Sequence, residues 1–263
     1  MRPLFRMTSI LALAFVGSGL APKRAAPESP TFAQSLESSL ETALLVQAPG
    51  LDPRVLALAL EAHDSAQQRG LLRDPATLTV IDYSRPSVDR RFWVFDLAAR
   101  RLLFAEWVAH GRNSGENFAT RFSNAASSLE SSLGLFVTEG VYSGKHGVSL
   151  RLDGLEPGFN DNAMERAIVI HGADYVGPAA VATLGFLGRS WGCPALSRQV
   201  APRVIERLSG GSAVFAYYPD ADWLARSRFL RADQADCTDR AGLSDRAADA
   251  PPYSGMETQL SSL

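Results

Sequence analysis

Hydrophobic and polar residues alternate with two different spacings along the chain, and the spacing changes near residue 77. Before it, apolar residues recur at helical spacing and predict a short amphipathic helix around Leu36, Leu40, Leu44 and Leu45. A second helix is predicted from the N-cap Asp52 and the first-turn Pro53 to the terminating Gly70. Its buried stripe should consist of Val55, Leu58, Ala59 and Ala62. We expect both helices to be packing elements without a chemical role.

After residue 77 the apolar residues form short, β-rich runs. Seven strand candidates follow, over residues 77–83, 91–97, 101–110, 133–138, 148–152, 167–171 and 213–218. The second and third are separated by a short turn and are expected to form a hairpin. One further helix is predicted over 201–208, ended by Gly210 and Gly211. The pattern therefore predicts a mostly β domain with peripheral helices.

Both ends of the chain differ from this domain. Arg2 and Arg6 precede a short apolar run and then small residues up to Ala21, which is the layout of a secretory signal peptide. A membrane anchor is the alternative, but the run is shorter than the ~20 residues that a spanning helix needs. We expect five segments: a signal peptide (1–21), a flexible leader with a short helix (22–50), a helical segment (51–76), the β domain (77–230) and a disordered polar tail (231–263).

These segments predict a mature protein outside the cytoplasm, in the periplasm, without a membrane span. The 263 residues carry a net charge of −2 and 46% hydrophobic residues, an ordinary globular composition. No basic stripe suggests a nucleic-acid partner. The two cysteines, Cys193 and Cys237, cannot alone form a zinc finger or an iron–sulfur site. An oxidised Cys193–Cys237 pair would block Cys193, but a free thiol in the tail is the expectation.

Candidate chemistry gathers between residues 168 and 194. Strand 167–171 ends in His171-Gly172, and Cys193 lies on the turn GRSWGCP over 188–194. A thiolate is a nucleophile, an imidazole can take the thiol proton, and amides of a glycine-containing turn can stabilise an oxyanion. Spacing alone also fits a small buried cysteine and a hydrogen-bonded histidine at a strand end.

Several sequence blocks resemble the murein L,D-transpeptidase catalytic domains with the YkuD-type fold, in the branch that carries GRSWGC. In order, these blocks are VAHGRNSG at 108–115, FSN at 122–124, SSLG at 131–134, GKHG at 144–147, LDGLE at 152–156, NDNA at 160–163 and GRSWGC at 188–193. The resemblance covers roughly residues 77–219. It implies a β-sandwich or barrel-like catalytic domain over 77–230.

The resemblance also implies an activity. Cys193 would be the nucleophile and His171 its base, and the substrate would be a stem peptide of peptidoglycan. Cys193 would attack the carbonyl that joins a diamino acid to D-alanine, releasing D-alanine and leaving a thioester. An amine from a second stem, a protein lysine or a free amino acid would then accept the acyl group. No cofactor and no metal is implied.

Two positions depart from the common family pattern. Many members have a histidine before the Gly-Cys pair, where this chain has Trp191, and Arg or Asn two residues after the cysteine, where it has Ala195. Arg189 is the candidate substitute for binding a substrate carboxylate. The other candidate substrate-binding or orienting residues are Ser190, Gly192, Gly172, Tyr175, Trp191, His110 and His146. Each of these residues could instead have a purely structural role, as a hydroxyl that stabilises a turn, an aromatic ring packed in the core or a residue of a loop.

Three alternatives stay open. An L,D-carboxypeptidase of the same fold would use water in place of the amine. A wall-binding module that has kept the fold without catalysis is the non-enzymatic alternative. A thiol peptidase of the NlpC/P60 type is disfavoured because such enzymes place the cysteine before the histidine along the chain.

Overall fold

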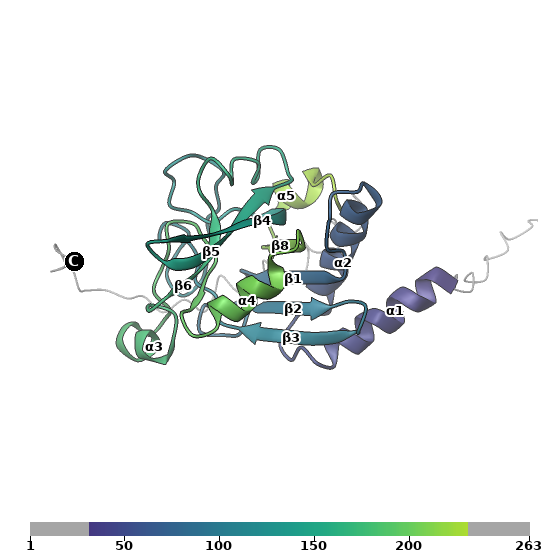
Figure 1. The fold of residues 1–263 in the computed structure, drawn as a ribbon, viewed down its shortest axis with the longest axis horizontal. Helices are drawn as coiled ribbons and strands as arrows, with labels where there is room; N and C mark the ends of the chain where they lie inside the picture. Colours follow the sequence, from purple (N-terminus) through teal and green to yellow (C-terminus); the bar gives the residue numbers. More distant parts are fainter. Residues whose placement is uncertain (1–31, 231–263) are drawn as a thin grey trace, which may run out of the picture.

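A single sheet of eight strands dominates the computed structural model, which describes residues 32–230 (Figure 1). The strands are β1 (Thr77–Asp82), β2 (Phe92–Asp96), β3 (Arg101–Glu106), β4 (Gly134–Gly144), β5 (Gly147–Gly154), β6 (Val169–Ala173), β7 (Ala195–Ser197) and β8 (Ala213–Tyr217). Their order in the sheet is β3-β2-β1-β8-β4-β5-β6-β7. The pairs β1–β8 and β6–β7 are parallel and the others are antiparallel.

The two edges of the sheet nearly meet. Beyond β3 the chain crosses to β7, where the Ala109 N–H donates to Ala195 O at 2.9 Å and the Ala195 N–H donates back at 3.4 Å. Further along, the Arg112 N–H donates to Ser190 O at 2.8 Å. We call this contact between residues 109–112 and 190–195 the closure seam. It confirms the predicted fold class, a mostly β, barrel-like domain, and it removes two exposed strand edges.

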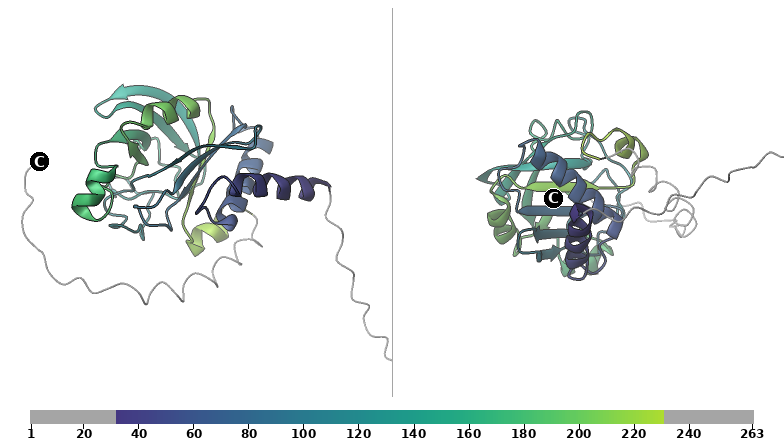
Figure 2. Two further views of the ribbon diagram at one scale, coloured as in Figure 1. Left: turned by 90° about the horizontal axis from the view of Figure 1, so that it is seen from below. Right: turned by 90° about the vertical axis from the view of Figure 1, so that its right-hand side faces the viewer.

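Five helices surround the sheet within residues 32–230: α1 (Phe32–Leu45), α2 (Pro53–Gln68), α3 (Pro178–Leu184), α4 (Ala201–Leu208) and α5 (Ala221–Arg226). The Asp52 side chain caps α2 by accepting the Arg54 N–H at 2.8 Å, and Pro53 occupies the first turn, as the sequence predicts. The predicted stripe of α2 is buried, and the helix packs on β1 and β8. Figure 2 shows α1 and α2 at one end of the barrel and α3 at the other.

All seven predicted strands form, and four differences stand out. Strand β4 continues to Gly144, six residues beyond its predicted end, because it pairs there with β5. The predicted strand 101–110 ends at Glu106, because the following residues leave β2 and join the closure seam. Strand β6 begins two residues later than predicted, after Ala167, whose φ of 54° interrupts extended backbone. The three-residue β7 was not predicted.

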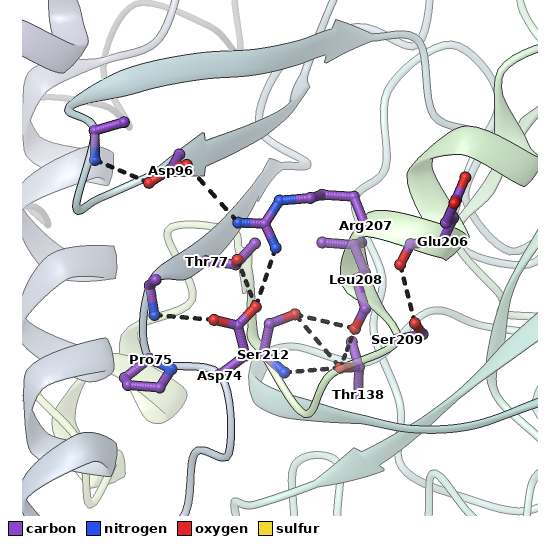
Figure 3. A network of polar contacts seen from close by, with 12 residues as sticks. Asp74, Pro75, Thr77, Asp96, Thr138, Glu206, Arg207, Leu208, Ser209 and Ser212 are labelled. Carbon is purple, nitrogen blue, oxygen red and sulfur yellow. Dashed lines mark hydrogen bonds and ion pairs between the residues drawn. The ribbon is translucent and has the colours of Figure 1, made fainter.

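Helix α4 contacts β5 and β6 and is fastened at its C-terminal end by a polar network (Figure 3). Arg207 Nη1 lies 3.1 Å from an Asp74 carboxylate oxygen, which also accepts the Thr77 hydroxyl at 2.6 Å. The Thr138 hydroxyl donates to the Leu208 carbonyl at 2.6 Å, satisfying a helix-terminal acceptor. The network therefore fastens the C-terminal end of α4 to the start of β1 and to β4.

A buried carboxylate organises the loop that leads into β6. Glu156 accepts the Leu135 N–H at 2.7 Å and the Trp223 indole N–H at 3.0 Å. Its own N–H donates to Asn160 Oδ1 at 2.7 Å, and Asn160 Nδ2 donates to Leu135 O at 3.0 Å. Burial raises the pKa of Glu156, and these hydrogen bonds offset part of that effect. The loop is thus tied to β4 and α5.

The predicted signal peptide over 1–21, the first part of the leader over 22–31, and the tail with Cys237 lie outside the described residues. Over residues 32–230, none of the helices combines the length and apolar character needed to cross a membrane.

We predict that Gly154→Ala destabilises the protein by about 1–3 kcal/mol, because a Cβ there would collide with the Asn160 backbone. The matched control is Gly177→Ala, where a Cβ meets no atom within 4 Å and the backbone is extended. It should change the free energy of unfolding by less than about 0.5 kcal/mol. Urea unfolding checks both; equal stabilities would contradict the tight packing of Gly154.

Candidate active site

Cys193 lies inside the closure seam, on the turn between Ser190 and β7. The turn is held from one side by the Ser190 N–H, which donates to His110 O at 2.9 Å. On its other side, Ala195 pairs with Ala109 across the seam and with His171 across β6–β7. Barrel closure and strand pairing therefore fix the position of the cysteine backbone.

Two serine hydroxyls set the orientation of the peptide groups around Cys193. The Ser190 hydroxyl donates to Cys193 O at 2.6 Å and accepts the Gly192 N–H at 3.1 Å. The Ser131 hydroxyl donates to Gly192 O at 3.1 Å and accepts the Gly111 N–H at 3.0 Å. Since the N–H and C=O of a trans peptide point in opposite directions, the Cys193 N–H faces away from Ser131.

Gly192 itself is required by this geometry. Its φ is 120°, which L side chains rarely adopt, and a Cβ would lie 2.7 Å from Glu130 O. Gly172, on β6, allows a different close approach, since a Cβ there would lie 3.2 Å from the Ala201 Cβ and the Arg198 Cα. Both glycines thus act on backbone packing around the site.

His171 is the central residue of β6, paired with Ser149 of β5 and Ala195 of β7. Its ring is 3% exposed, and Nδ1 lies 3.1 Å from the Gly172 carbonyl oxygen. A carbonyl only accepts, so Nδ1 carries the proton and Nε2 carries the lone pair. Burial lowers the pKa of His171, and the His146, Arg198 and Lys145 side chains lower it further. The ring is therefore a neutral imidazole near pH 7.

The resting thiol is also neutral. Cys193 Sγ donates to the Ala167 carbonyl at 3.7 Å, and no hydrogen bond joins it to His171 in the described structure. Burial raises the pKa of the thiol, while the Val169 N–H and the Arg166 and Lys145 cations oppose that rise. These contacts place the thiol beside the backbone of residues 167–169, which leads directly to His171 in β6. His171 itself pairs with Ala195, two residues after Cys193.

The tip of the β4–β5 hairpin lies over this pair. The His146 ring stacks on the His171 ring with centroids 4.4 Å apart and an angle of 31° between the planes. The Lys145 Nζ lies 5.0 Å from the centroid of the Trp191 ring, which is 66% exposed. His146 therefore lies against the candidate base and Trp191 against Lys145; their role in binding substrate stays a prediction.

Tyr175 is joined to the start of the cysteine turn, because its carbonyl oxygen accepts the Gly188 N–H at 2.8 Å. Burial raises the pKa of its phenol. Arg189 points elsewhere: its guanidinium lies over the Phe186 ring at 5.4 Å, and Nη1 donates to Gly115 O at 3.4 Å.

His110 is buried away from solvent. It is 1% exposed, and Nδ1 accepts from Arg91 Nη2 at 2.7 Å while Nε2 lies 3.3 Å from Gly115 O. Burial and the Arg91 charge lower its pKa to about 3. The prediction that the His110 side chain lines the substrate groove is therefore wrong; it supports the closure seam through its backbone.

Three residues near Cys193 were missed as site residues: Ser131, Lys145 and Arg166. Arg166 donates to Glu130 O at 2.6 Å and to the Ser132 hydroxyl at 2.5 Å, so its charge is held beside the cysteine turn. A signal for Lys145 was present, since it is the only lysine between residues 32 and 230. Within that range, no group of three or more His, Cys, Asp or Glu side chains could hold a metal ion.

The class of protein is thus a nearly closed β-barrel domain with a cysteine turn and a histidine strand paired at its seam. Residues 47–217, more than half of the chain, match the family model of the L,D-transpeptidase catalytic domain, YkuD_2. The chain therefore belongs to the L,D-transpeptidase catalytic-domain family. No curated protein sequence matches it.

Several solved structures, L,D-transpeptidases among them, are similar at low identity. One from Mycobacterium smegmatis is 15% identical with a TM-score of 0.35, covering 54% of this chain and 59% of that one. The cell shape determining protein Pgp2 from Campylobacter jejuni is 13% identical with a TM-score of 0.36, covering 54% and 47%. One from Xylanimonas cellulosilytica is 14% identical with a TM-score of 0.32, covering 68% and 91%. This chain thus spans less than two thirds of the first two.

Alkylation by iodoacetamide tests the protonation of the resting thiol. Because burial holds its pKa above the ordinary 9.0, the rate at Cys193 should rise until beyond pH 9. At pH 7 it should be below about 1% of the limiting rate. Peptide mass mapping separates Cys193 from Cys237. A midpoint below pH 8 would contradict the neutral resting pair.

Proposed function

We propose that this protein is an exported L,D-transpeptidase that cuts and rejoins peptidoglycan stem peptides through a thioester on Cys193. The observation that supports the proposal is the parallel β6–β7 pairing, which joins His171 to Ala195, two residues after Cys193, while the neutral His171 ring is protonated on Nδ1. Membership of the family supports the substrate class. The expected signal peptide supports export to the periplasm.

In the first half-reaction, His171 Nε2 takes the thiol proton as Cys193 Sγ attacks the carbonyl between the diamino acid and D-alanine. Sγ must leave the Ala167 carbonyl for this step, by rotation of the side chain. The Cys193 N–H, turned away from Ser131, is the available donor for the developing oxyanion. Collapse breaks the C–N bond, and the imidazolium protonates the departing D-alanine amine.

In the second half-reaction, His171 takes a proton from the acceptor amine as its nitrogen attacks the thioester. The C–S bond breaks, an amide forms, and the thiolate recovers its proton from the imidazolium. One amide replaces another, so the exchange needs no energy source. The amine acceptor would come from a second stem, a protein lysine or a free amino acid.

Water is the alternative acceptor, which would make the protein an L,D-carboxypeptidase. Cys193 is partly exposed, and Trp191, two residues before it, is 66% exposed, which supports access of water to a thioester at this position. A non-catalytic wall-binding module would have no need for the oriented tautomer of His171.

Cys193→Ser should reduce D-alanine release from a defined tetrapeptide stem by about 10³-fold or more, since it removes the proposed nucleophile. Cys237→Ser is the matched control because it changes the only other cysteine, and it should keep wild-type turnover. Chromatography of released D-alanine measures both. Full turnover by Cys193→Ser would refute the proposed mechanism.

A second assay separates the two acceptors. With increasing glycine or D-amino acid, we expect the exchange product to rise and saturate while the hydrolysis product falls, because both compete for one thioester. Mass spectrometry of the products gives their ratio. Hydrolysis product alone at every amine concentration would assign the carboxypeptidase reaction instead.

A further inference from the structure

Lys145 is an unusual residue in this chain. Of the 26 lysine and arginine residues, only Lys23 and Lys145 are lysines, and the structure describes only Lys145. It lies at the tip of the β4–β5 hairpin, where Gly144 pairs with Gly147. A compact ammonium differs from a guanidinium in being a point charge on a flexible stem. The one lysine of the domain therefore stands beside the proposed reacting pair.

The Lys145 ammonium has no carboxylate partner. None of the ion pairs between residues 32 and 230 includes it, and its recorded contact is the Trp191 ring, 5.0 Å away. An ammonium on an aromatic face leaves its outer N–H groups available to an anion. Both side chains are exposed, so a ligand can reach them.

The positive potential of Lys145 reaches the reacting groups. It lowers the pKa of His146, of His171 and of Cys193. The contacts agree: Lys145 precedes His146, whose ring stacks on His171 at 4.4 Å, and its ammonium lies over Trp191 of the cysteine turn, so it stands where the hairpin tip, β6 and that turn meet. An anionic group bound at Lys145 would therefore lie next to the thiol and imidazole.

The neighbouring arginines are already engaged. Arg198 makes a two-pronged ion pair with Asp174 at 2.6 and 2.7 Å. Arg166 donates to four oxygens of residues 123–132. Arg189, the candidate from the sequence, lies on Phe186 and adds its charge to the surroundings of the buried His110. Lys145 is the cation near Cys193 that these contacts leave available.

We propose that Lys145, seated on Trp191, binds a carboxylate of the donor stem peptide and so determines donor specificity. This inference rests on the proposed function. Two carboxylates flank the scissile amide of such a donor, one on the diamino acid and one on the terminal D-alanine. Both present the same chemistry to an ammonium. Donors amidated at one or the other position distinguish them.

The test compares kcat/KM of wild type, Lys145→Met and Lys145→Arg on three donors: the free stem, the stem amidated at the diamino acid, and the stem amidated at D-alanine. Lys145→Met should lose about 10- to 100-fold on the free stem, mainly through KM. On one of the amidated stems it should lose less than about 2-fold, and that stem identifies the carboxylate. Lys145→Arg should recover part of the loss, since it keeps the charge.

Arg151→Met is the matched control. Arg151 lies on the same hairpin, with its guanidinium 4.3 Å from the Tyr142 ring centroid, so it is another cation on an aromatic face. This variant should match wild type on all three donors. An equal loss by Lys145→Met on every donor, or no loss, would overturn the carboxylate assignment.

Binding without turnover keeps this test separate from the proposed function. In a Cys193→Ser background, calorimetry should show that Lys145→Met weakens binding of the free stem and leaves binding of one amidated stem unchanged. If the wild-type protein turned over no donor, the proposed reaction would be refuted. The binding comparison would still show whether Lys145 binds a donor carboxylate. Equal binding with and without the lysine, or no donor binding at all, would overturn the proposal.

Discussion

The closure of the sheet is the constraint on which the candidate site depends. Backbone hydrogen bonds between residues 109–112 and 190–195 join the two edges of the barrel, and Cys193 lies within that contact. The same turn continues into β7, whose parallel pairing with β6 joins His171 to Ala195, two residues after Cys193. A cysteine on a flexible surface loop would lose conformational entropy each time the loop became ordered around a substrate. In this protein, folding itself orders the cysteine turn.

Burial then decides the charge state of the pair. It raises the pKa of Cys193 and lowers the pKa of His171, so both groups are neutral at rest. A buried ion pair would carry a large desolvation cost, which the neutral pair avoids. Arg166 and Lys145 place positive charge nearby, and it becomes most favourable once negative charge develops on sulfur or on a bound carbonyl oxygen. The site is thus arranged for charge that appears during reaction.

Local signals in the sequence predicted much of this molecule. Asp52 and Pro53 mark the start of α2, β-branched and aromatic runs mark most strands, and the GRSWGC turn with His171 marks the candidate pair. Long-range contacts could not be predicted from the sequence. The closure seam joins residues some 80 positions apart, and the three-residue β7 exists through its pairing with β6. His110 looked like a groove residue because sequence does not reveal that Arg91 is buried beside it.

The central claim is that Cys193 holds the acyl fragment of a stem peptide. Mass spectrometry of the full chain, quenched by acid soon after mixing with a defined tetrapeptide stem, tests it most directly. The account predicts a mass increase equal to the stem less D-alanine, located on the peptide that contains Cys193 and removed by hydroxylamine. Products formed without such an adduct at any quench time, or an adduct on another residue, would contradict it.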